Sequence, residues 1–337
     1  MKVVLDAMGG DFAPQVPVLG AVQAVRELGV KVVLTGKEEL LREELKKYSY
    51  PEGLIEVVPA SEVVGMDEQP AKALKKKDSS IRVGLNLVKE GYGDAFVSAG
   101  NTGAVMAISL FTVGRVRGVE RPAITAILPN LKGYTFLLDV GANVDCKPHH
   151  LLQFAVMGSA YARYVLGEEN PRVGLLNIGE EEGKGNELTK EAYKLLKLAK
   201  EKGLNFAGNA EGRDVYSGEF DVIVCDGFVG NVCLKLSESL AKILAKILKE
   251  EIEKHFISRI GAVTLKPAIK GFKRRIDYAE QGGAPLLGVN APVIISHGSS
   301  NAKAIKNAIR TATQFVESEL NRHIEEEIGR YGKTDGN

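Results

Sequence analysis

Short runs of Val, Ile and Leu alternate along nearly the whole chain with longer amphipathic segments. Strands that alternate with helices need crossover connections, which give a mostly parallel sheet with helices on both faces. The alternation therefore predicts an α/β protein, and 337 residues suffice for one large domain or two smaller ones. The predicted strands are Lys2 to Leu5, Val30 to Leu34, Ile55 to Val58, Ala95 to Val97, Ala123 to Leu128, Tyr134 to Leu138, Val173 to Asn177, Asp221 to Val224 and Val293 to Ile295.

Two of the predicted strands are too close in sequence for a crossover helix between them. Ala123 to Leu128 and Tyr134 to Leu138 are separated only by residues 129–133, which predicts a hairpin and a mixed sheet with at least one antiparallel strand. No flexible linker or fixed repeat interrupts the chain, so we expect a single domain over residues 1–337, with two lobes sharing one sheet as the alternative.

Two long helices are predicted in the last third of the chain. Ser237 to His255 is strongly amphipathic, and Asn301 to Gly329 shows a second helical pattern. Between them, Phe256 to Ile276 mixes apolar and basic residues, and we expect a helical protrusion at about residues 250–280.

Charge and cysteine content limit the classes of binding partner and the cellular compartment that we expect. Lys plus Arg (44) and Asp plus Glu (43) nearly cancel, so no global basic field recruits nucleic acid. Three cysteines without a CxxC pair indicate a reducing compartment. The start MKVVLDAMGGD lacks a signal-peptide core, and no stretch is long enough to span a bilayer. We expect a cytoplasmic protein that is not integral to a membrane.

Small and polar residues follow most of the predicted strands. Parallel sheets bind ligands beyond the carboxyl ends of their strands, where helix N-termini favour anions. We expect six such loops to meet at one edge, although glycine is also common in ordinary turns. The candidate phosphate-binding residues are Asp6, Gly9, Gly10, Ser98, Asn101, Thr102, Gly103, Asn143, Asn177, Asp226, Ser299, Ser300 and Asn301.

Several familiar sites are not predicted. The GxGxxG motif is absent after the first strand, and the loop from Gly179 to Gly185 has neither the spacing nor the hydroxyl of a P-loop. His149 and His150 should point in different directions on a helix and have no third ligand nearby in sequence, so we expect no metal. No GxSxG motif provides an acyl-serine, and Cys225 and Cys233 fit buried inert thiols.

A series of short sequence motifs along the chain points to one protein family. Together, and in this order, the motifs resemble those of the PlsX phosphate acyltransferases over essentially the whole chain. The blocks are DAMGGDFAP (6–14), SAGNTGA (98–104), RPAI (121–124), LLDVGAN (137–143), LLNIGEEEGKG (175–185), GNAEG (208–212), DVIVCDGFVGNVCLK (221–235), GGAPLLGV (282–289) and HGSSNAKA (297–304).

The resemblance implies a fold and a reaction. The fold would be a three-layer α/β/α, Rossmann-like, mixed and mostly parallel sheet, like that of phosphotransacetylase and isopropylmalate dehydrogenase, in a homodimer. The reaction would move a fatty acyl group from acyl carrier protein to inorganic phosphate without a cofactor, giving acyl phosphate for phospholipid synthesis. The next acyltransferase, which uses acyl phosphate and glycerol 3-phosphate, would be a partner. A short-chain acyl-CoA:phosphate transferase and a non-catalytic phosphate- or carrier-binding scaffold remain alternatives.

By the same resemblance, Lys184 and Asn231 would be catalytic. Phosphate is already an anionic nucleophile and the pantetheine thiolate a fair leaving group, so the step needs positioning and charge stabilisation more than a general base. Lys184 can hold phosphate and Asn231 can donate to the tetrahedral oxygen. The alternatives are a solvated lysine in an acidic loop and an N-cap of the following helix.

A membrane contact is predicted at the tip of the expected protrusion. Its apolar residues are Ile257, Ile260, Val263 and Leu265, and they precede the basic Lys266, Lys270, Lys273, Arg274 and Arg275. An apolar tip with a basic flank suits peripheral attachment to the anionic inner face of the cytoplasmic membrane. Packing in a dimer interface is the alternative.

Overall fold

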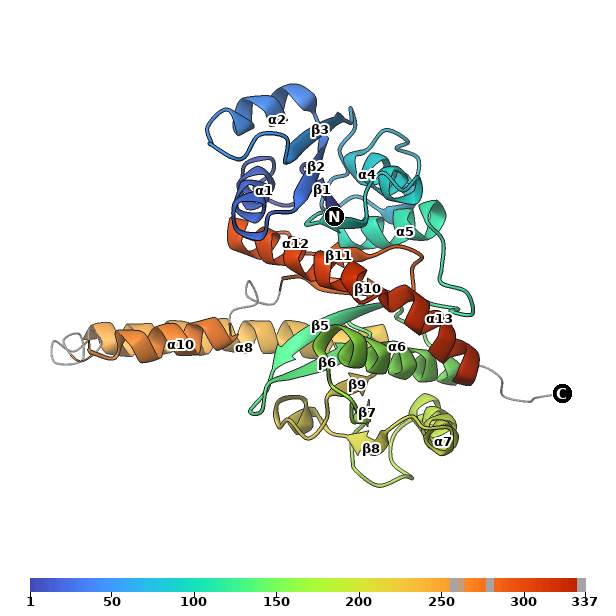
Figure 1. Cartoon of the computed structure of the whole chain (residues 1–337). Helices are drawn as coiled ribbons and strands as arrows, with labels where there is room; N and C mark the ends of the chain where they lie inside the picture. The colour runs from blue at the N-terminus through green and yellow to red at the C-terminus, as the bar shows by residue number, and fades with distance from the viewer. Residues whose placement is uncertain (255–260, 262–263, 277–281, 332–337) are drawn as a thin grey trace.

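One large sheet runs through the whole molecule in the computed structural model, which describes residues 1–254, 261, 264–276 and 282–331 (Figure 1). It is an 11-stranded sheet in the order β3-β2-β1-β4-β11-β10-β5-β6-β9-β7-β8. The strands are β1 (Lys2–Asp6), β2 (Lys31–Gly36), β3 (Ile55–Pro59), β4 (Ala95–Ser98), β5 (Ala123–Pro129), β6 (Tyr134–Leu138), β7 (Val173–Leu176), β8 (Phe206–Ala210), β9 (Val222–Val224), β10 (Ala284–Leu287) and β11 (Val293–Ile295).

All the strands expected from the sequence are present, and β5 and β6 form the expected antiparallel pair. Two strands were missed. β8 has the sequence FAGNA with a single large apolar residue, and β10 has the sequence APLL, which is four residues long and contains a proline. Neither has the β-branched run on which strand prediction depends.

Helices cover both faces of the sheet, which confirms the three-layer α/β/α architecture. Alternate residues of a strand face opposite sides. Val3 and Leu5 accordingly pack in a core with α1, α6, α7, α12 and α13, whereas Val4 packs with α4 and α5. The helices are α1 (Gln15–Leu28), α2 (Glu38–Leu45), α3 (Pro70–Ala73), α4 (Ser80–Lys89), α5 (Thr102–Thr112), α6 (Pro148–Leu166), α7 (Glu187–Glu201), the 3-10 helix η1 (Gly212–Tyr216), α8 (Gly227–Lys254), α10 (Lys266–Ile276), α12 (Ala302–Glu317) and α13 (Leu320–Tyr331).

The direction of the strands reverses in the middle of the sheet. β11 is antiparallel to β10, β10 to β5, and β5 to β6. After three reversals, β6 and its parallel neighbours β9, β7 and β8 run opposite to β1, β2, β3, β4 and β11. The expectation that all six strand-end loops meet at one edge is therefore wrong. It failed because β10 was not recognised, and strand order cannot be read from periodicity.

The C-terminal helices also differ from the sequence-based expectation. α8 begins at Gly227, ten residues before Ser237. The predicted single helix from Asn301 to Gly329 is wrong, because α12 ends at Glu317 and α13 begins at Leu320. The break lies at Glu319, whose φ of 49° is incompatible with a right-handed helix. α8 extends away from the sheet as a long arm (Figure 1).

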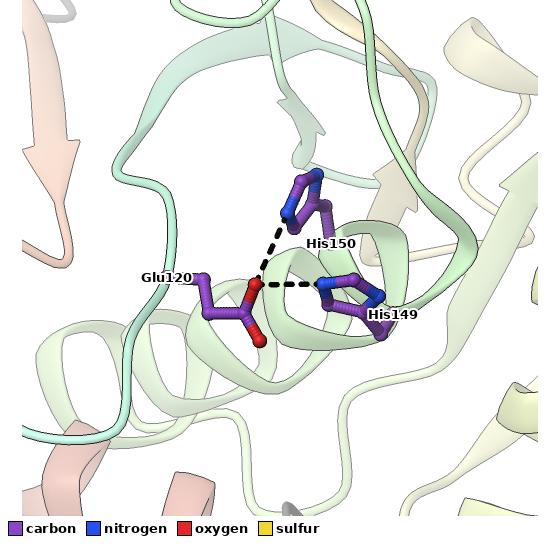
Figure 2. A group of neighbouring side chains, drawn as sticks. All are labelled: Glu120, His149 and His150. Carbon is purple, nitrogen blue, oxygen red and sulfur yellow. Dashed lines mark hydrogen bonds and ion pairs between the residues drawn. The ribbon is translucent and has the colours of Figure 1, made fainter.

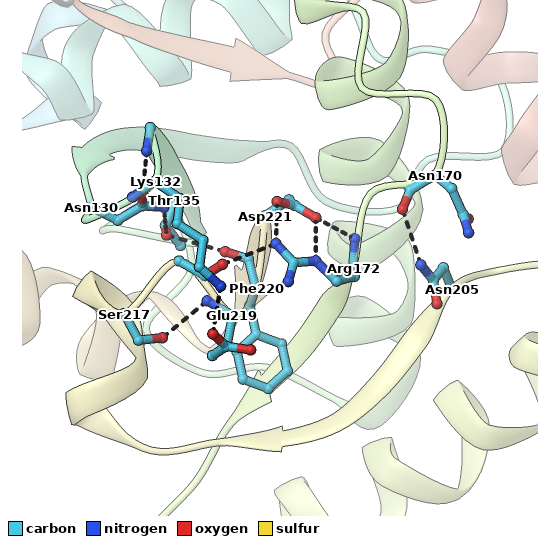
Figure 3. Close-up of polar contacts among 12 residues, drawn as sticks. Asn130, Lys132, Thr135, Asn170, Arg172, Asn205, Ser217, Glu219, Phe220 and Asp221 are labelled. Atoms are coloured by element: carbon cyan, nitrogen blue, oxygen red, sulfur yellow. Dashed lines mark hydrogen bonds and ion pairs between the residues drawn. The ribbon is translucent and has the colours of Figure 1, made fainter.

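A polar network fixes the amino ends of β6, β7 and β9 (Figure 3). Arg172 donates from Nη2 and Nε to the two carboxylate oxygens of Asp221 at 2.9 and 3.0 Å, and its backbone N–H donates to the same carboxylate at 2.7 Å. Thr135 donates to the carbonyl of Phe220 at 3.2 Å. These contacts hold the amino ends of β6, β7 and β9 in fixed positions relative to one another. The loops that follow the carboxyl ends of the three strands therefore begin at the same side of a rigid sheet.

Candidate active site

The candidate residues fall into two groups at opposite edges of the sheet. The first cluster follows β1, β4 and β11 and comprises residues 6–11, 98–103 and 296–301. The second cluster follows β6, β7 and β9 and comprises residues 139–143, 177–186 and 225–231. Lys184 and Asn231 both belong to the second cluster, and the strands that precede them are adjacent and parallel.

Asp6 organises the first cluster from inside the protein. Its carboxylate is buried and accepts hydrogen bonds from Ser98 Oγ at 2.7 Å and from the backbone N–H of Met8 at 3.1 Å. Burial raises the pKa of Asp6. A Cβ at Gly9 would lie 2.4 Å from Asp6 Oδ2 and 2.7 Å from the backbone nitrogen of Gly100, so only glycine allows this approach. Asp6 and Gly9 thus hold the loops after β1 and β4 together.

A small cleft lies between the loops after β1 and β11. Its lining includes Gly9, Gly10, Ala99, Gly298 and Ser300. The N–H of Asp11 donates to the carbonyl of Gly298 at 2.8 Å, and Gly10 has a φ of 99°. Ser300 is buried, and its hydroxyl has no hydrogen-bond partner within the described residues. An unsatisfied buried hydroxyl beside a cleft is the kind of group that a ligand oxygen completes.

Two helices begin at the first cluster. Asn101 caps α5, because its side-chain oxygen accepts a hydrogen bond from the N–H of Ala104 at 3.0 Å. Asn301 caps α12 in the same way, accepting from the N–H of Ala304 at 2.9 Å. The amide of Asn101 also donates to the carbonyls of residues 66 and 68 at 2.7 and 2.8 Å, so it holds a neighbouring loop. Thr102 and Gly103 form the first turn of α5. Ser299 contacts the ring of His297 at 2.8 Å.

Asp139, which is not among the site residues predicted from the sequence, organises the second cluster. One carboxylate oxygen accepts from the N–H groups of Ile124, Gly141 and Ala142 at 3.0, 3.2 and 3.0 Å, and the other accepts from the backbone and side-chain nitrogens of Asn143 at 2.6 and 2.9 Å. Burial raises the pKa of Asp139, while these hydrogen bonds lower it. The aspartate of the LLDVGAN block was the signal that could have identified it.

The first turn of α8 packs directly against this loop. Asp226 accepts from the N–H groups of Phe228 and Val229 at 3.0 and 2.9 Å and so caps the helix. Asn231 is therefore not the N-cap but the fifth residue of α8. Its exposed side chain faces the turn after β6, because a Cβ on Gly141 would lie 3.7 Å from Asn231 Cγ.

Asn177 shapes the loop that carries Lys184. Its Oδ1 accepts from the N–H of Ile178 at 2.9 Å and its Nδ2 donates to the carbonyl of Lys184 at 3.2 Å. Gly185 has a φ of 96°, and a Cβ there would lie 2.1 Å from Thr189 Oγ1. The backbone next to Lys184 is thus held on both sides, while the lysine side chain is exposed.

The glutamates beside Lys184 are held by other cations. Arg213 pairs with Glu180 at 2.6 Å, and Lys197 pairs with Glu182 at 3.0 Å. Lys184 makes no ion pair within the described part of the chain. The loop is acidic in sequence, but two of its three charges are compensated without Lys184, which leaves that ammonium group available for an anion.

His149 and His150 do not point in different directions, contrary to the expectation (Figure 2). Both Nε2 atoms face one carboxylate oxygen of Glu120, at 2.8 and 3.5 Å. Glu120 is the third potential metal ligand beside the two histidines, and it could not be found from sequence spacing because it lies 29 residues before His149. The N–H of Lys147 donates to His150 Nδ1 at 3.0 Å, so the neutral ring carries its proton on Nε2. That proton occupies the lone-pair position that a metal would need on the His150 ring, and His149 Nε2 is hydrogen-bonded to Glu120 at 2.8 Å, so the contacts favour a structural link between α6 and residue 120.

The cysteines lie around the second cluster. Cys225 is buried and Cys146 and Cys233 are partly buried. Burial raises the pKa of Cys225 and Cys233, and it raises the pKa of Cys146 to about 12. Protonated thiols are poor nucleophiles, so the expectation of unreactive cysteines agrees with their surroundings.

The predicted membrane contact is described only in part. Ile257, Ile260 and Val263 lie outside the described residues. Leu265 is 58% exposed, immediately before α10. No helix within the described residues combines the length and the apolarity needed to cross a bilayer.

The α/β/α fold of this chain is also found in phosphotransacetylases. A phosphotransacetylase from Streptococcus pyogenes superposes with a TM-score of 0.64 over 94% of each chain, at 18% identity. The model of the family described as fatty acid synthesis protein matches residues 1–323. The chain belongs to that family, and its assignment to the PlsX proteins is confirmed.

Curated relatives match over almost their full length. A phosphate acyltransferase from Nitratidesulfovibrio vulgaris (strain DP4) is 54% identical, covering 98% of this chain and 97% of its own. A phosphate acyltransferase from Aquifex aeolicus is 55% identical, covering 96% of each.

Proposed function

We propose that this chain transfers a fatty acyl group from acyl carrier protein to inorganic phosphate, forming acyl phosphate for phospholipid synthesis. The single observation that carries the proposal is 54% identity over nearly the full length to a phosphate acyltransferase. The similarity to a phosphotransacetylase is only 18% and concerns the fold, so the short-chain alternative is not favoured.

The second cluster supports a direct transfer without a covalent enzyme intermediate. An oxygen of hydrogen phosphate attacks the thioester carbon, the carbon–sulfur bond breaks, and the leaving thiolate takes up the proton that the phosphate releases. Lys184, which is unpaired among the described residues, holds the phosphate and offsets the charge that grows on the carbonyl oxygen. Asn231, exposed beside the 139–143 turn, donates its amide N–H to that oxygen. This chemistry needs no cofactor.

The first test is turnover with acyl carrier protein carrying a fatty acyl group and with phosphate. We expect wild-type protein to form acyl phosphate, and Lys184→Ala to lose most of the activity with an intact fold, since an exposed loop lysine fills no core space. Asn231→Ala should lower kcat by about two to three orders of magnitude, the usual scale for one oxyanion donor.

Lys190→Ala is the matched control, because Lys190 is an exposed lysine in the first turns of the following helix α7. It should keep wild-type turnover. Wild-type protein that binds the acylated carrier but never releases acyl phosphate would favour the scaffold alternative. A Lys184→Ala variant within a few-fold of wild type would remove the role given to that residue.

The functional unit that we propose is a homodimer joined along α8. This helix exposes a line of large apolar side chains, which we call the α8 stripe: Phe228, Val229, Val232, Leu236, Leu240, Ile243, Leu244, Ile247 and Leu248. The side chains recur three or four residues apart, the spacing of helices that pack on one another in water. A second copy would bury the stripe, which a single chain leaves in contact with solvent.

Peripheral membrane contact is proposed at the far end of the same arm. The exposed Leu265 and Phe272 lie among Lys266 and Lys270, which are also exposed. Apolar side chains near basic ones suit the boundary between acyl chains and anionic head groups. There the product would reach the acyltransferase that consumes acyl phosphate together with glycerol 3-phosphate.

The membrane contact is tested with Ile260 and Val263 both changed to Asp. Sedimentation with anionic vesicles should fall sharply, because apolar area that would enter the membrane is lost, while light scattering should show an unchanged oligomer, because neither residue belongs to the α8 stripe. Replacement of Lys31, exposed at the start of β2, by Asp is the control for a change of charge alone. Unchanged sedimentation, or dissociation of the oligomer, would contradict the assignment.

A further inference from the structure

An arginine that the proposed chemistry does not use lies at the same edge of the sheet as the second cluster. Arg121 comes two residues before β5, and β5 is antiparallel to β6, so the start of β5 lies level with the loop that follows β6. The N–H of Ile124 donates to Asp139 at 3.0 Å, and the side-chain amide of Asn143 donates to the carbonyl of Pro122 at 2.7 Å. These two hydrogen bonds tie the backbone that follows Arg121 to the second cluster.

The backbone that precedes Arg121 is held by α6. The N–H of Glu120 donates to the side chain of Gln153 at 2.9 Å, and the amide of Gln153 donates to the carbonyl of Gly118 at 2.9 Å. His149 also contacts the carboxylate of Glu120, at 2.8 Å (Figure 2). Both neighbours of Arg121 are thus fixed, which lowers the entropic cost of ordering this residue around a ligand.

The guanidinium of Arg121 is available for a ligand. Its side chain is exposed and forms no ion pair or hydrogen bond within the described residues. The adjacent acid, Glu120, faces His149 and His150 instead, at 2.8 and 3.5 Å. Arg121 therefore repeats the arrangement found at Lys184: the backbone is held, the neighbouring acid is engaged by other side chains, and the cation is left for an anion.

The charge of Arg121 acts on the second cluster. Burial raises the pKa of Cys146 to about 12 and the negative charges of Asp139 and Asp226 raise it too, whereas the positive charge of Arg121 lowers it. The thiol of Cys146 contacts the carbonyl of Asn143 at 3.5 Å. The guanidinium therefore lies near enough to the loop after β6 for its charge to act there.

We infer that Arg121 is a further phosphate-binding residue of the candidate active site and holds the phosphate substrate together with Lys184, an inference that rests on the proposed acyl transfer. The strand order β5-β6-β9-β7 places these two cations on either side of Asn231, at one edge of the sheet. Three inter-strand spacings of about 4.8 Å separate β5 from β7 by roughly 14 Å. Two long cationic side chains span that gap by reaching toward an anion between them.

A guanidinium suits this role for a geometric reason. Its N–H groups donate two parallel hydrogen bonds to two oxygens of one phosphate, which orients the ion as well as attracting it. The ammonium of Lys184 adds a compact charge from the other side. Two positive charges match the two negative charges of hydrogen phosphate, and a further oxygen stays free to attack the thioester carbon.

The test is steady-state kinetics with each substrate varied in turn. We expect Arg121→Ala to lower kcat/KM for phosphate by about ten- to a hundredfold, the range for a lost hydrogen bond to a charged group, with an unchanged KM for the acylated carrier protein. Arg121→Lys should lose less, because it keeps the charge without the paired N–H groups. Arg117→Ala is the matched control: Arg117 is another exposed arginine between α5 and β5, and its loss should leave the kinetics unchanged.

A second readout does not depend on turnover. Inorganic phosphate that binds the folded protein raises its Tm, so at constant ionic strength the rise should be smaller for Arg121→Ala than for wild type or Arg117→Ala. Unchanged kinetics for phosphate in Arg121→Ala would overturn the inference. So would an effect confined to the KM for the acylated carrier, which would assign Arg121 to the phosphodiester of the carrier's prosthetic group.

Failure of the proposed function has a different signature. Wild-type protein that forms no acyl phosphate would refute the acyl transfer itself. The dependence of Tm on phosphate would then still decide whether Arg121 binds the ion, because an equal rise in wild type and Arg121→Ala would contradict that role.

Discussion

Many of the polar residues that follow the strands hold their own loops. Asn101 and Asn301 cap helices, Asp226 caps α8, and the amide of Asn143 donates to Asp139 and to the carbonyl of Pro122 at 2.9 and 2.7 Å. Composition at a strand end predicts that a polar side chain is useful there, but it does not say whether a ligand or the backbone uses it. For Lys184, the decisive fact is the pairing of its neighbours, which depends on residues that are distant in sequence.

Arg213 should protect Lys184 from the glutamate beside it. Arg213→Ala frees Glu180 from its 2.6 Å ion pair, and the released carboxylate can then compete with phosphate for Lys184. We expect kcat/KM for phosphate to fall by up to about fivefold, since an exposed ion pair is worth up to about 1 kcal/mol and 1.4 kcal/mol is a factor of ten. The measurement is steady-state kinetics with phosphate as the varied substrate.

The double variant Arg213→Ala/Glu180→Gln separates this effect from a structural one. Removing the released charge should restore most of the lost kcat/KM. Lys132→Ala is the control, because it breaks the exposed 2.6 Å pair with Glu219 and should leave the kinetics unchanged. Absence of rescue in the double variant would show that Arg213 acts in another way.

At the scale of elements, the sequence predicts types better than it predicts boundaries or directions. The predicted strands and the hairpin are present because their alternating apolar pattern directly reflects burial on a sheet. The start of α8 was placed ten residues late, since Gly227 and Gly230 are poor helix formers. They are used there because the first turn must approach the loop after β6, a tertiary requirement that no local pattern carries.

Gly230 tests this requirement. A Cβ at this position would lie 1.9 Å from the carbonyl oxygen of Asp139. Ala in a helix normally gains about 1 kcal/mol over Gly, but displacing buried backbone typically costs 1–3 kcal/mol, so the clash should prevail. We expect Gly230→Ala to lower the free energy of unfolding in urea and to reduce turnover by moving Asn231.

Gly212→Ala is the control for a change of glycine alone, because nothing lies within 4 Å of the added Cβ. Its free energy of unfolding should change by less than about 0.5 kcal/mol. A Gly230→Ala protein as stable and as active as wild type would mean that α8 can shift without consequence for the site.

For the whole molecule, the reversal within the sheet matters most. Periodicity establishes strands and helices, but the order of strands depends on pairings such as β10 with β5 that join residues far apart in sequence. The α/β/α architecture was thus predictable, whereas the separation of the site into two clusters was not.

Assembly is tested by changing Leu240 and Ile243 on the α8 stripe to Asp. Both side chains are exposed in one chain, so the monomer should keep its fold, while two charges in an apolar interface should prevent pairing. We expect monomers by light scattering. Lys242→Glu, an exposed change on the same helix, should remain a dimer with normal activity. A Leu240→Asp/Ile243→Asp protein that remains a dimer would contradict pairing along the α8 stripe.

The pairing of the chain's two ends has a further consequence for how the protein is made. Residues 134–224 supply β6, β7, β8 and β9, so that half of the sheet can form as soon as its own stretch has left the ribosome. The other half of the sheet is completed only when residues 284–317 have been synthesised. β11 then pairs with β4, and Lys306 of α12 forms an ion pair with Glu27 of α1 at 2.6 Å. β4, whose residues are synthesised early, therefore acquires its second neighbour only after β11 has been made.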